Sequence, residues 1–160
     1  MTGTLDREKA LDIYLNDHLA GASGGCELAR RLADAHQDQK NGSVLRRIAD
    51  EVSADRESLI GIMRRHDVPV RRLKVLAGLV GERLGRLKLN GRLLFRSPLS
   101  SLIELELMRI GVQGKAAAWY ALREAALTDD RFDRTQLDTL IERAEDQVRT
   151  LEDLRREAAR

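Results

Sequence analysis

Apolar residues recur every three or four positions along most of this chain, which is the spacing of amphipathic helices. Leu11, Leu15 and Leu19 mark one face near the N-terminus. No segment of useful length alternates between apolar and polar residues with period two, so no sheet is expected. The pattern predicts helices over residues 5–38, 43–66, 69–89, 98–127 and 134–159.

Turn and capping residues separate these segments. Ser43 suits the N-cap of the second helix, and Asp133 with Gln136 resembles a capping box before the last. Pro69 and Pro98 each suit the first turn of a helix. Short connections join the first two and the last two long helices, so each pair should be antiparallel. The expected fold is all-α: an up-down four-helix bundle with a long crossover that includes an additional basic helix.

Length and composition narrow the class of protein. The 160 residues suit a single domain spanning 1–160, and 42% apolar with only 3% aromatic residues indicates an aliphatic core. Cys26 is the only cysteine, which excludes an internal disulfide and a cysteine-based zinc cluster. No apolar run approaches about 20 residues, so no membrane-spanning helix is expected. The first residues lack the apolar core of a signal peptide, so a cytoplasmic location is expected.

Two short motifs resemble bacterioferritin and its relatives in the ferritin-like superfamily. Residues 15–19 match the family's opening L-N-x-x-L, and residues 50–54 align with its D-E-x-x-H. The resemblance implies a ferritin-like bundle with one crossover. In that alignment Glu51 matches a metal-binding Glu, whereas Ala22 and Ala54 stand where the family has a ligand Glu and a ligand His.

The di-iron centre of this family needs the Glu-x-x-His spacing, which places a carboxylate and an imidazole on one helix face. The residues three positions before His18, His36 and His66 are apolar, so the chain contains no such motif. We therefore expect no cofactor. A divergent iron or manganese oxidoreductase stays open as an alternative, with the ligands His18, Glu51, Glu106, Glu142 and Glu145.

The first helix contains a run of small residues over 20–26, including three glycines. Each glycine inside a helix costs about 1 kcal/mol relative to alanine, so the run needs a reason. The favoured interpretation is close packing around a bulky group such as Trp119 or Tyr120. The alternative is a ligand cavity at the bundle centre, with the candidate lining residues Ala22, Gly25, Ala54 and Trp119.

Residues 69–96 hold eight basic side chains and one acidic side chain, although the net charge of the whole chain is only +2. The favoured interpretation is that acids on neighbouring helices neutralise this segment. The alternative is an anion-binding surface. The helix predicted over 69–89 has no aromatic residue to stack on bases, so nucleic acid is not favoured. The anion-binding candidates are Arg71, Arg72, Lys74, Arg83, Arg86 and Lys88.

The sequence therefore favours a non-catalytic ferritin-like bundle with a structural or protein-interaction role. Glycines at 78, 81 and 85 form a small-residue face that suits close helix–helix approach, either within the chain or across a dimer. We expect a homodimer. The metal-binding oxidoreductase and the binder of anionic surfaces or nucleic acid through 69–96 are the alternatives.

Overall fold

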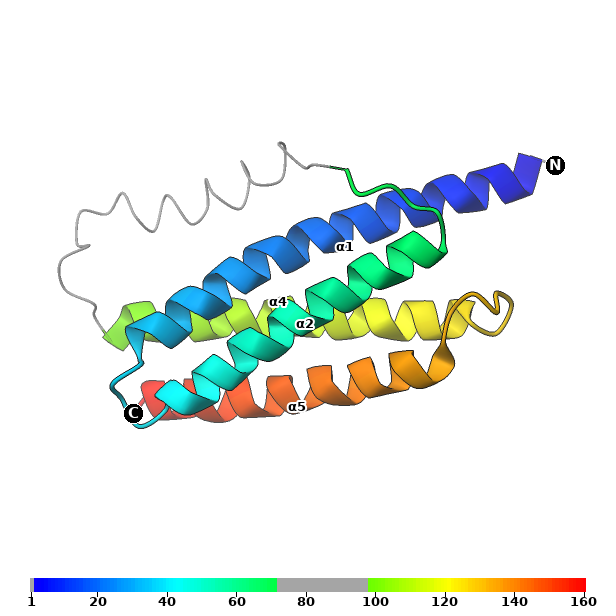
Figure 1. Cartoon of the computed structure of the whole chain (residues 1–160). Coiled ribbons are helices and arrows are strands. Elements are labelled where there is room, and N and C mark those ends of the chain that lie inside the picture. The colour runs from blue at the N-terminus through cyan, green and yellow to red at the C-terminus, as the bar shows by residue number, and fades with distance from the viewer. Residues whose placement is uncertain (1, 72–97) are drawn as a thin grey trace.

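The structure is a computed structural model, and it describes residues 2–71 and 98–160. These ranges contain four long helices and no strand (Figure 1). The all-α prediction is confirmed, and the helix ends lie within a few residues of those expected from the sequence. The helices are α1 (Thr2–Ala35), α2 (Gly42–Arg65), α4 (Pro98–Ala125) and α5 (Arg134–Ala158).

The helices form two hairpins that pack into one bundle. Helix α1 packs against α2 and also against α4, and α4 packs along α5. Figure 1 shows α2 and α4 running in the same direction, so the end of α2 and the start of α4 lie at opposite ends of the bundle. Residues 68–71 are not helical, whereas a helix was predicted from residue 69. The rest of that predicted basic helix lies outside the described residues.

The core is aliphatic, as the composition predicts. Each helix turns its apolar stripe inward, and the burial of these side chains is the main source of stability. Trp119 on α4 is the largest of the fully buried side chains, at 2% exposure. Other core side chains that are almost completely buried are Leu15, Leu32, Ile48, Ile62, Met63, Leu137, Leu140 and Leu151.

The two hairpin turns have local causes. Asp133 is the N-cap of α5, and its Oδ1 accepts a hydrogen bond from the Gln136 backbone N–H at 3.0 Å, as predicted. Helix α2 begins at Gly42 rather than after Ser43. A Cβ at Gly42 would collide with the backbone carbonyl oxygens of the preceding turn, so only glycine fits this position.

Asn16 fixes the segment that follows α2 against α1. Its side chain is buried, its Oδ1 accepts from the Arg71 backbone N–H at 2.8 Å, and its Nδ2 donates to the Pro69 carbonyl at 3.2 Å. These bonds attach the non-helical residues Pro69 and Arg71 to α1. A buried amide with satisfied partners therefore explains one residue of the L-N-x-x-L motif by local structure.

His66 is the C-cap of α2 and lies in an apolar environment. Its side chain is fully buried, and its ring stacks on Phe132 with 3.8 Å between ring centroids. Neither ring nitrogen has a hydrogen-bond partner among the described residues, although Nδ1 lies 3.8 Å from Asp129 Oδ2. Burial, assisted by the nearby Arg131, lowers the pKa of His66 below its usual 6.5. The neutral imidazole is therefore the form that suits the fold.

We expect the free energy of unfolding to decrease as the pH falls from about 7 to about 5. The unfolded chain binds a proton at His66 near the usual pKa of 6.5, whereas the folded chain resists it. The stabilisation is therefore present above this pKa and is lost as the pH falls toward the folded pKa.

Urea denaturation at each pH measures this change in the free energy of unfolding. His66→Leu should flatten the dependence, and His36→Gln should preserve it. Equal slopes in the wild type and His66→Leu would refute the assignment.

Candidate functional site

Three helices meet in a buried polar cluster at the centre of the bundle. Asp55 on α2 is 1% exposed and forms an ion pair with Lys115 on α4. The Lys115 Nζ also donates a hydrogen bond to Gln147 Oε1 on α5 at 2.5 Å, and Gln147 is completely buried. One ammonium group therefore joins α2, α4 and α5 through contacts with two buried side chains.

Further polar groups surround this cluster. The Gln147 Nε2 donates to Glu51 Oε2 at 2.9 Å. Arg143 Nη1 lies 3.2 Å from Asp55 Oδ1, close enough for an ion pair, although the two atoms are not aligned for a hydrogen bond. Asp55 is thus placed between the cations of Lys115 and Arg143. A buried carboxylate is tolerated only with such compensation, because its desolvation costs several kcal/mol.

The ionisation of Lys115 reflects its position. Burial lowers the pKa of the Lys115 ammonium, and the Asp55 carboxylate opposes that effect. The hydrogen bond from Lys115 to Asp55 opposes it as well. Lys115 therefore faces its counter-charge directly at the bundle centre.

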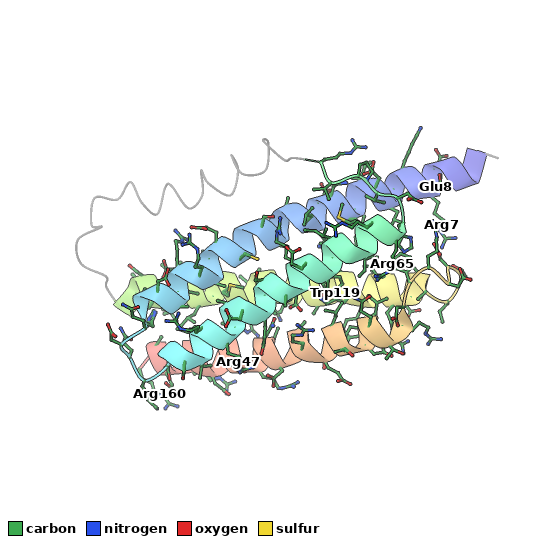
Figure 2. All side chains as sticks on the ribbon, in the orientation of Figure 1. Arg7, Glu8, Arg47, Arg65, Trp119 and Arg160 are labelled. Atoms are coloured by element: carbon green, nitrogen blue, oxygen red, sulfur yellow. The ribbon has the colours of Figure 1, made fainter. Side chains whose placement is uncertain are left out.

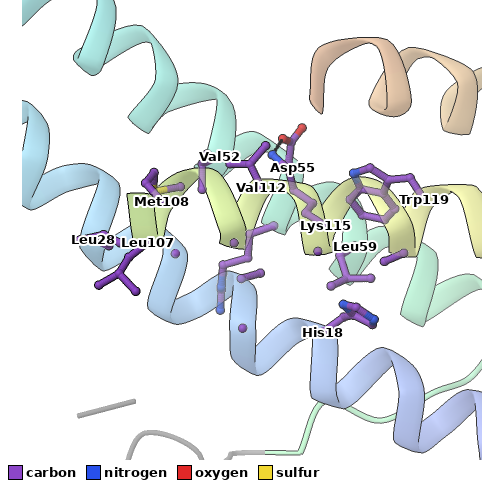
Figure 3. A pocket seen from close by; sticks show the side chains of 17 residues that line it. His18, Leu28, Val52, Asp55, Leu59, Leu107, Met108, Val112, Lys115 and Trp119 are labelled. Atoms are coloured by element: carbon purple, nitrogen blue, oxygen red, sulfur yellow. Dashed lines mark hydrogen bonds and ion pairs between the residues drawn. The ribbon is translucent and has the colours of Figure 1, made fainter. Parts of the chain in front are cut away.

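A cavity of about 230 Å³ lies beside this cluster, with walls from α1, α2 and α4 (Figure 3). Most of its wall is apolar. Asp55 and Lys115 line one part of it, and His18 and Arg56 supply its other charged or titratable groups. His18 stacks edge-on against Tyr14, and burial lowers its pKa. The apolar wall includes Leu28, Val52, Leu59, Met108, Val112 and Trp119.

Glycines line this cavity on two sides. Gly21 and Gly25 belong to α1, and Gly111 and Gly114 belong to α4. A Cβ built at any of these four positions would meet no atom within 4 Å. The favoured sequence interpretation, in which glycines allow close packing, is therefore wrong at Gly21 and Gly25. These glycines border open space.

The two aromatic neighbours on α4 have opposite positions. Trp119 is buried and lines the cavity, and its indole N–H has no hydrogen-bond partner in the described structure. Tyr120 is 46% exposed, and its hydroxyl donates to Glu145. Only Trp119 therefore fills the bundle interior, which the sequence interpretation had left open between the two.

Of the four residues that the sequence predicted to line a cavity, three do so and one does not. Ala22, Gly25 and Trp119 line the cavity. Ala54 does not, because its side chain is exposed and the next residue, Asp55, is the one that points inward. The prediction for Ala54 is corrected accordingly.

The structure does not gather the residues of the alternative metal site, which are His18, Glu51, Glu106, Glu142 and Glu145. Glu106 lies 3.6 Å from Arg155, Glu145 accepts from Tyr120, and Glu142 is exposed. Within residues 2–71 and 98–160, no group of three or more His, Cys, Asp or Glu side chains is arranged to hold a metal ion. These carboxylates instead have their own partners or face solvent.

The anion-binding candidates lie mostly beyond the described part of the chain. Arg71 is exposed and forms an ion pair with Asp12 on α1. The remaining candidates, Arg72, Lys74, Arg83, Arg86 and Lys88, lie outside the described residues.

Sequence reasoning missed the central cluster, although a signal was present. Asp55 follows Val52 and precedes Leu59 at helical spacing, which places a carboxylate within an apolar stripe. Lys115 and Gln147 interrupt the apolar stripes of their own helices in the same way. One polar residue within the stripe of each of three helices indicates a buried polar cluster, because an unpaired buried charge is too costly.

We expect Lys115→Met to lower the free energy of unfolding by about 3–5 kcal/mol, because it leaves the buried Asp55 carboxylate without its closest cation. Chemical denaturation measures the loss. The double variant with Asp55→Leu should recover much of it. Arg47→Met removes a half-exposed ion pair with Glu51 and should cost far less. A loss as small as that of Arg47→Met would contradict the central role of Lys115.

No protein-family model, curated protein or solved structure matches this chain. Among the described residues, no helix is both long and apolar enough to cross a membrane. Function is therefore inferred from the central cluster and the cavity beside it.

Proposed function

We propose that this protein is a non-catalytic helical bundle that binds a small, largely apolar molecule in the cavity between α1 and α4. The observation that supports this most is the set of four cavity glycines, whose missing side chains leave space that no atom of residues 2–71 and 98–160 fills. Well-formed apolar pockets with a few polar groups are the usual sites for small ligands.

The energetic argument rests on the cost of glycine in a helix. Gly25 and Gly114 each destabilise their helix by about 1 kcal/mol relative to alanine. A close helix–helix contact would justify that cost, but a Cβ at either position has room. The cost instead keeps a volume open. Gly114 is itself exposed, so this volume is reachable from solvent and a ligand can enter it.

The size of the cavity limits the ligand. A cavity of about 150 Å³ accepts benzene. By proportion, the 230 Å³ here suits a ligand of roughly nine non-hydrogen atoms. Short aliphatic chains and small aromatic compounds fall in this range.

The polar groups of the cavity support binding rather than catalysis. Asp55 and Lys115 pair with each other, and neither is left as a free base or nucleophile. Cys26 lies near Val52, and burial raises the pKa of its thiol, which disfavours the reactive thiolate.

A ferritin-like ancestry and a cytoplasmic location belong to the same proposal. The two antiparallel hairpins and the parallel directions of α2 and α4 support the ancestry. In such a bundle, the Lys115 ammonium would supply positive charge in the region where relatives hold metal ions. A chain of that kind would have replaced a metal site with an ion pair and a cavity.

Binding of octan-1-ol tests the proposal. Trp119 is the only tryptophan and lines the cavity, so its fluorescence reports occupancy. We expect a saturable change in the wild type. Gly25→Leu should abolish the change, because the new side chain fills the cavity, while thermal stability is kept or raised by the better helix former.

Gly61→Leu on α2 is the matched control, because Gly61 does not line the cavity and a Cβ there meets only the Arg65 side chain at 3.9 Å. It should bind octan-1-ol as the wild type does. Absence of saturable binding to the wild type, or unchanged binding to Gly25→Leu, would refute the proposed function.

A protein contact on the outer face of α4 is a second candidate, and it corresponds to the homodimer expected from the sequence. Ile110 is 62% exposed and Leu107 38% exposed. Together with Gly114, Ala117 and Ala121 they recur at alternating spacings of three and four residues. All five are exposed, and two of them, Leu107 and Gly114, also line the edge of the cavity. An exposed apolar stripe of this spacing suits packing against another helix.

Sedimentation equilibrium tests this contact. If the stripe joins two copies, the wild type should show a concentration-dependent dimer. Ile110→Lys should then be monomeric, because it places a charge in the apolar seam. Arg149→Glu on α5, an exposed position away from the stripe, should leave the dimer intact. A wild type that stays monomeric across the concentration range would rule out this candidate.

A further inference from the structure

The polar wall of the cavity indicates the chemistry of its ligand, if the proposed small-molecule binding is correct. We infer that the cavity takes a short apolar carboxylic acid in its anionic form. Lys115 and Arg56 on the cavity wall keep N–H groups without an acceptor in the described part of the chain. Asp55, the one carboxylate among the described lining residues, already faces two cations of the protein. Both features favour an anionic head group over a neutral or cationic one.

The polar wall of the cavity has more N–H donors than the described residues supply acceptors for. Lys115 has three N–H donors, of which two bond to Asp55 and Gln147. The indole N–H of Trp119 is buried and has no acceptor within residues 2–71 and 98–160. That indole nitrogen is closed off from the cavity as well as from solvent, so the remaining Lys115 N–H is the donor that a ligand oxygen would reach.

Arg56 adds a further donor group to the cavity wall. Its Nε donates to Ser23 Oγ at 3.2 Å, and its Nη1 pairs with Glu57 at 2.7 Å. The Glu57 side chain is 65% exposed, so this ion pair contributes little to fixing Arg56. The guanidinium keeps further N–H groups for a ligand, and two parallel bonds to a carboxylate are its preferred geometry.

The charge balance favours the same class of ligand. The cavity is lined by the cations Arg56 and Lys115 and by the single carboxylate Asp55. Asp55 is compensated by Lys115 and also by Arg143 outside the cavity. A carboxylate ligand would therefore bring the charge of this wall closer to zero, whereas an ammonium ligand would add another cation.

One end of the cavity wall is apolar. Figure 3 shows Leu28, Leu107 and Met108 together at that end, with Lys115 among apolar neighbours such as Leu59 and Trp119 toward the other. A ligand with an apolar tail and one polar head fits this arrangement. Octanoate, with about ten non-hydrogen atoms, matches both the estimated size and the polarity.

A comparison of three eight-carbon probes tests the inference on the wild-type protein. Octanoate, octan-1-ol and octylamine share one alkyl chain and differ in the charge of the head group. We expect octanoate to bind at least about tenfold more tightly than octan-1-ol, as one or two charged hydrogen bonds would give. Octylamine should bind most weakly. Trp119 fluorescence and calorimetry give the dissociation constants.

Two variants locate the head group. Arg56→Met should weaken octanoate by about tenfold and leave octan-1-ol unchanged, because it removes only the charge-assisted bonds. Glu57→Gln is the matched control. It frees Arg56 from its exposed partner, so octanoate should bind as tightly as before or more tightly. Equal weakening of both probes by Arg56→Met would contradict the assignment.

The outcomes separate this inference from the function on which it rests. If no probe binds, the proposed small-molecule binding fails. If octan-1-ol binds as tightly as octanoate, the cavity binds ligands but the carboxylate inference is wrong. If octylamine binds most tightly, Asp55 is the group that receives the ligand, and the inference is also wrong. None of these three comparisons depends on a variant that must fold.

Discussion

The ion pair between Asp55 and Lys115 is the constraint from which the rest of this bundle follows. A carboxylate that is 1% exposed requires a cation within reach, and the Lys115 ammonium supplies it from the neighbouring helix. The same ammonium bonds to Gln147, which brings the fourth helix to the same point. The register of α2, α4 and α5 is therefore set by a polar contact within a largely aliphatic core. Figure 2 shows Trp119 within this core, between the helices.

Helix α1 contributes small residues to the bundle centre, where the other three helices contribute polar ones. It presents Gly21, Ala22 and Gly25 toward the cavity. A larger side chain there has room, yet none is present, and α4 repeats the arrangement with Gly111 and Gly114. The bundle therefore combines a rigid polar centre with an adjacent apolar volume. That combination suits selective binding of a small amphipathic molecule, because the donors are fixed before the ligand arrives.

The sequence predicted the helices well because long 3.6-residue periodicity is a strong local signal, and it predicted the Asp133 cap for the same reason. The sequence predicted poorly which residues occupy the bundle centre. The alignment with an E-x-x-H pattern directed attention to Glu51 and Ala54, whereas the inward residue is Asp55. Small residues have two opposite uses in a helix, close approach and open space, and only the positions of neighbouring helices distinguish them. For Gly25 the neighbouring atoms are too far away for close approach.

The indole N–H resonance of Trp119 tests the central claim most directly. The chain has one tryptophan, so a two-dimensional ¹H–¹⁵N spectrum contains one indole cross-peak from the cavity wall. Addition of octanoate should move this cross-peak progressively and then saturate, because the indole ring gains a new neighbour. A cross-peak that does not move at saturating octanoate, while backbone resonances confirm a folded protein, would contradict the account of an open cavity beside the ion pair.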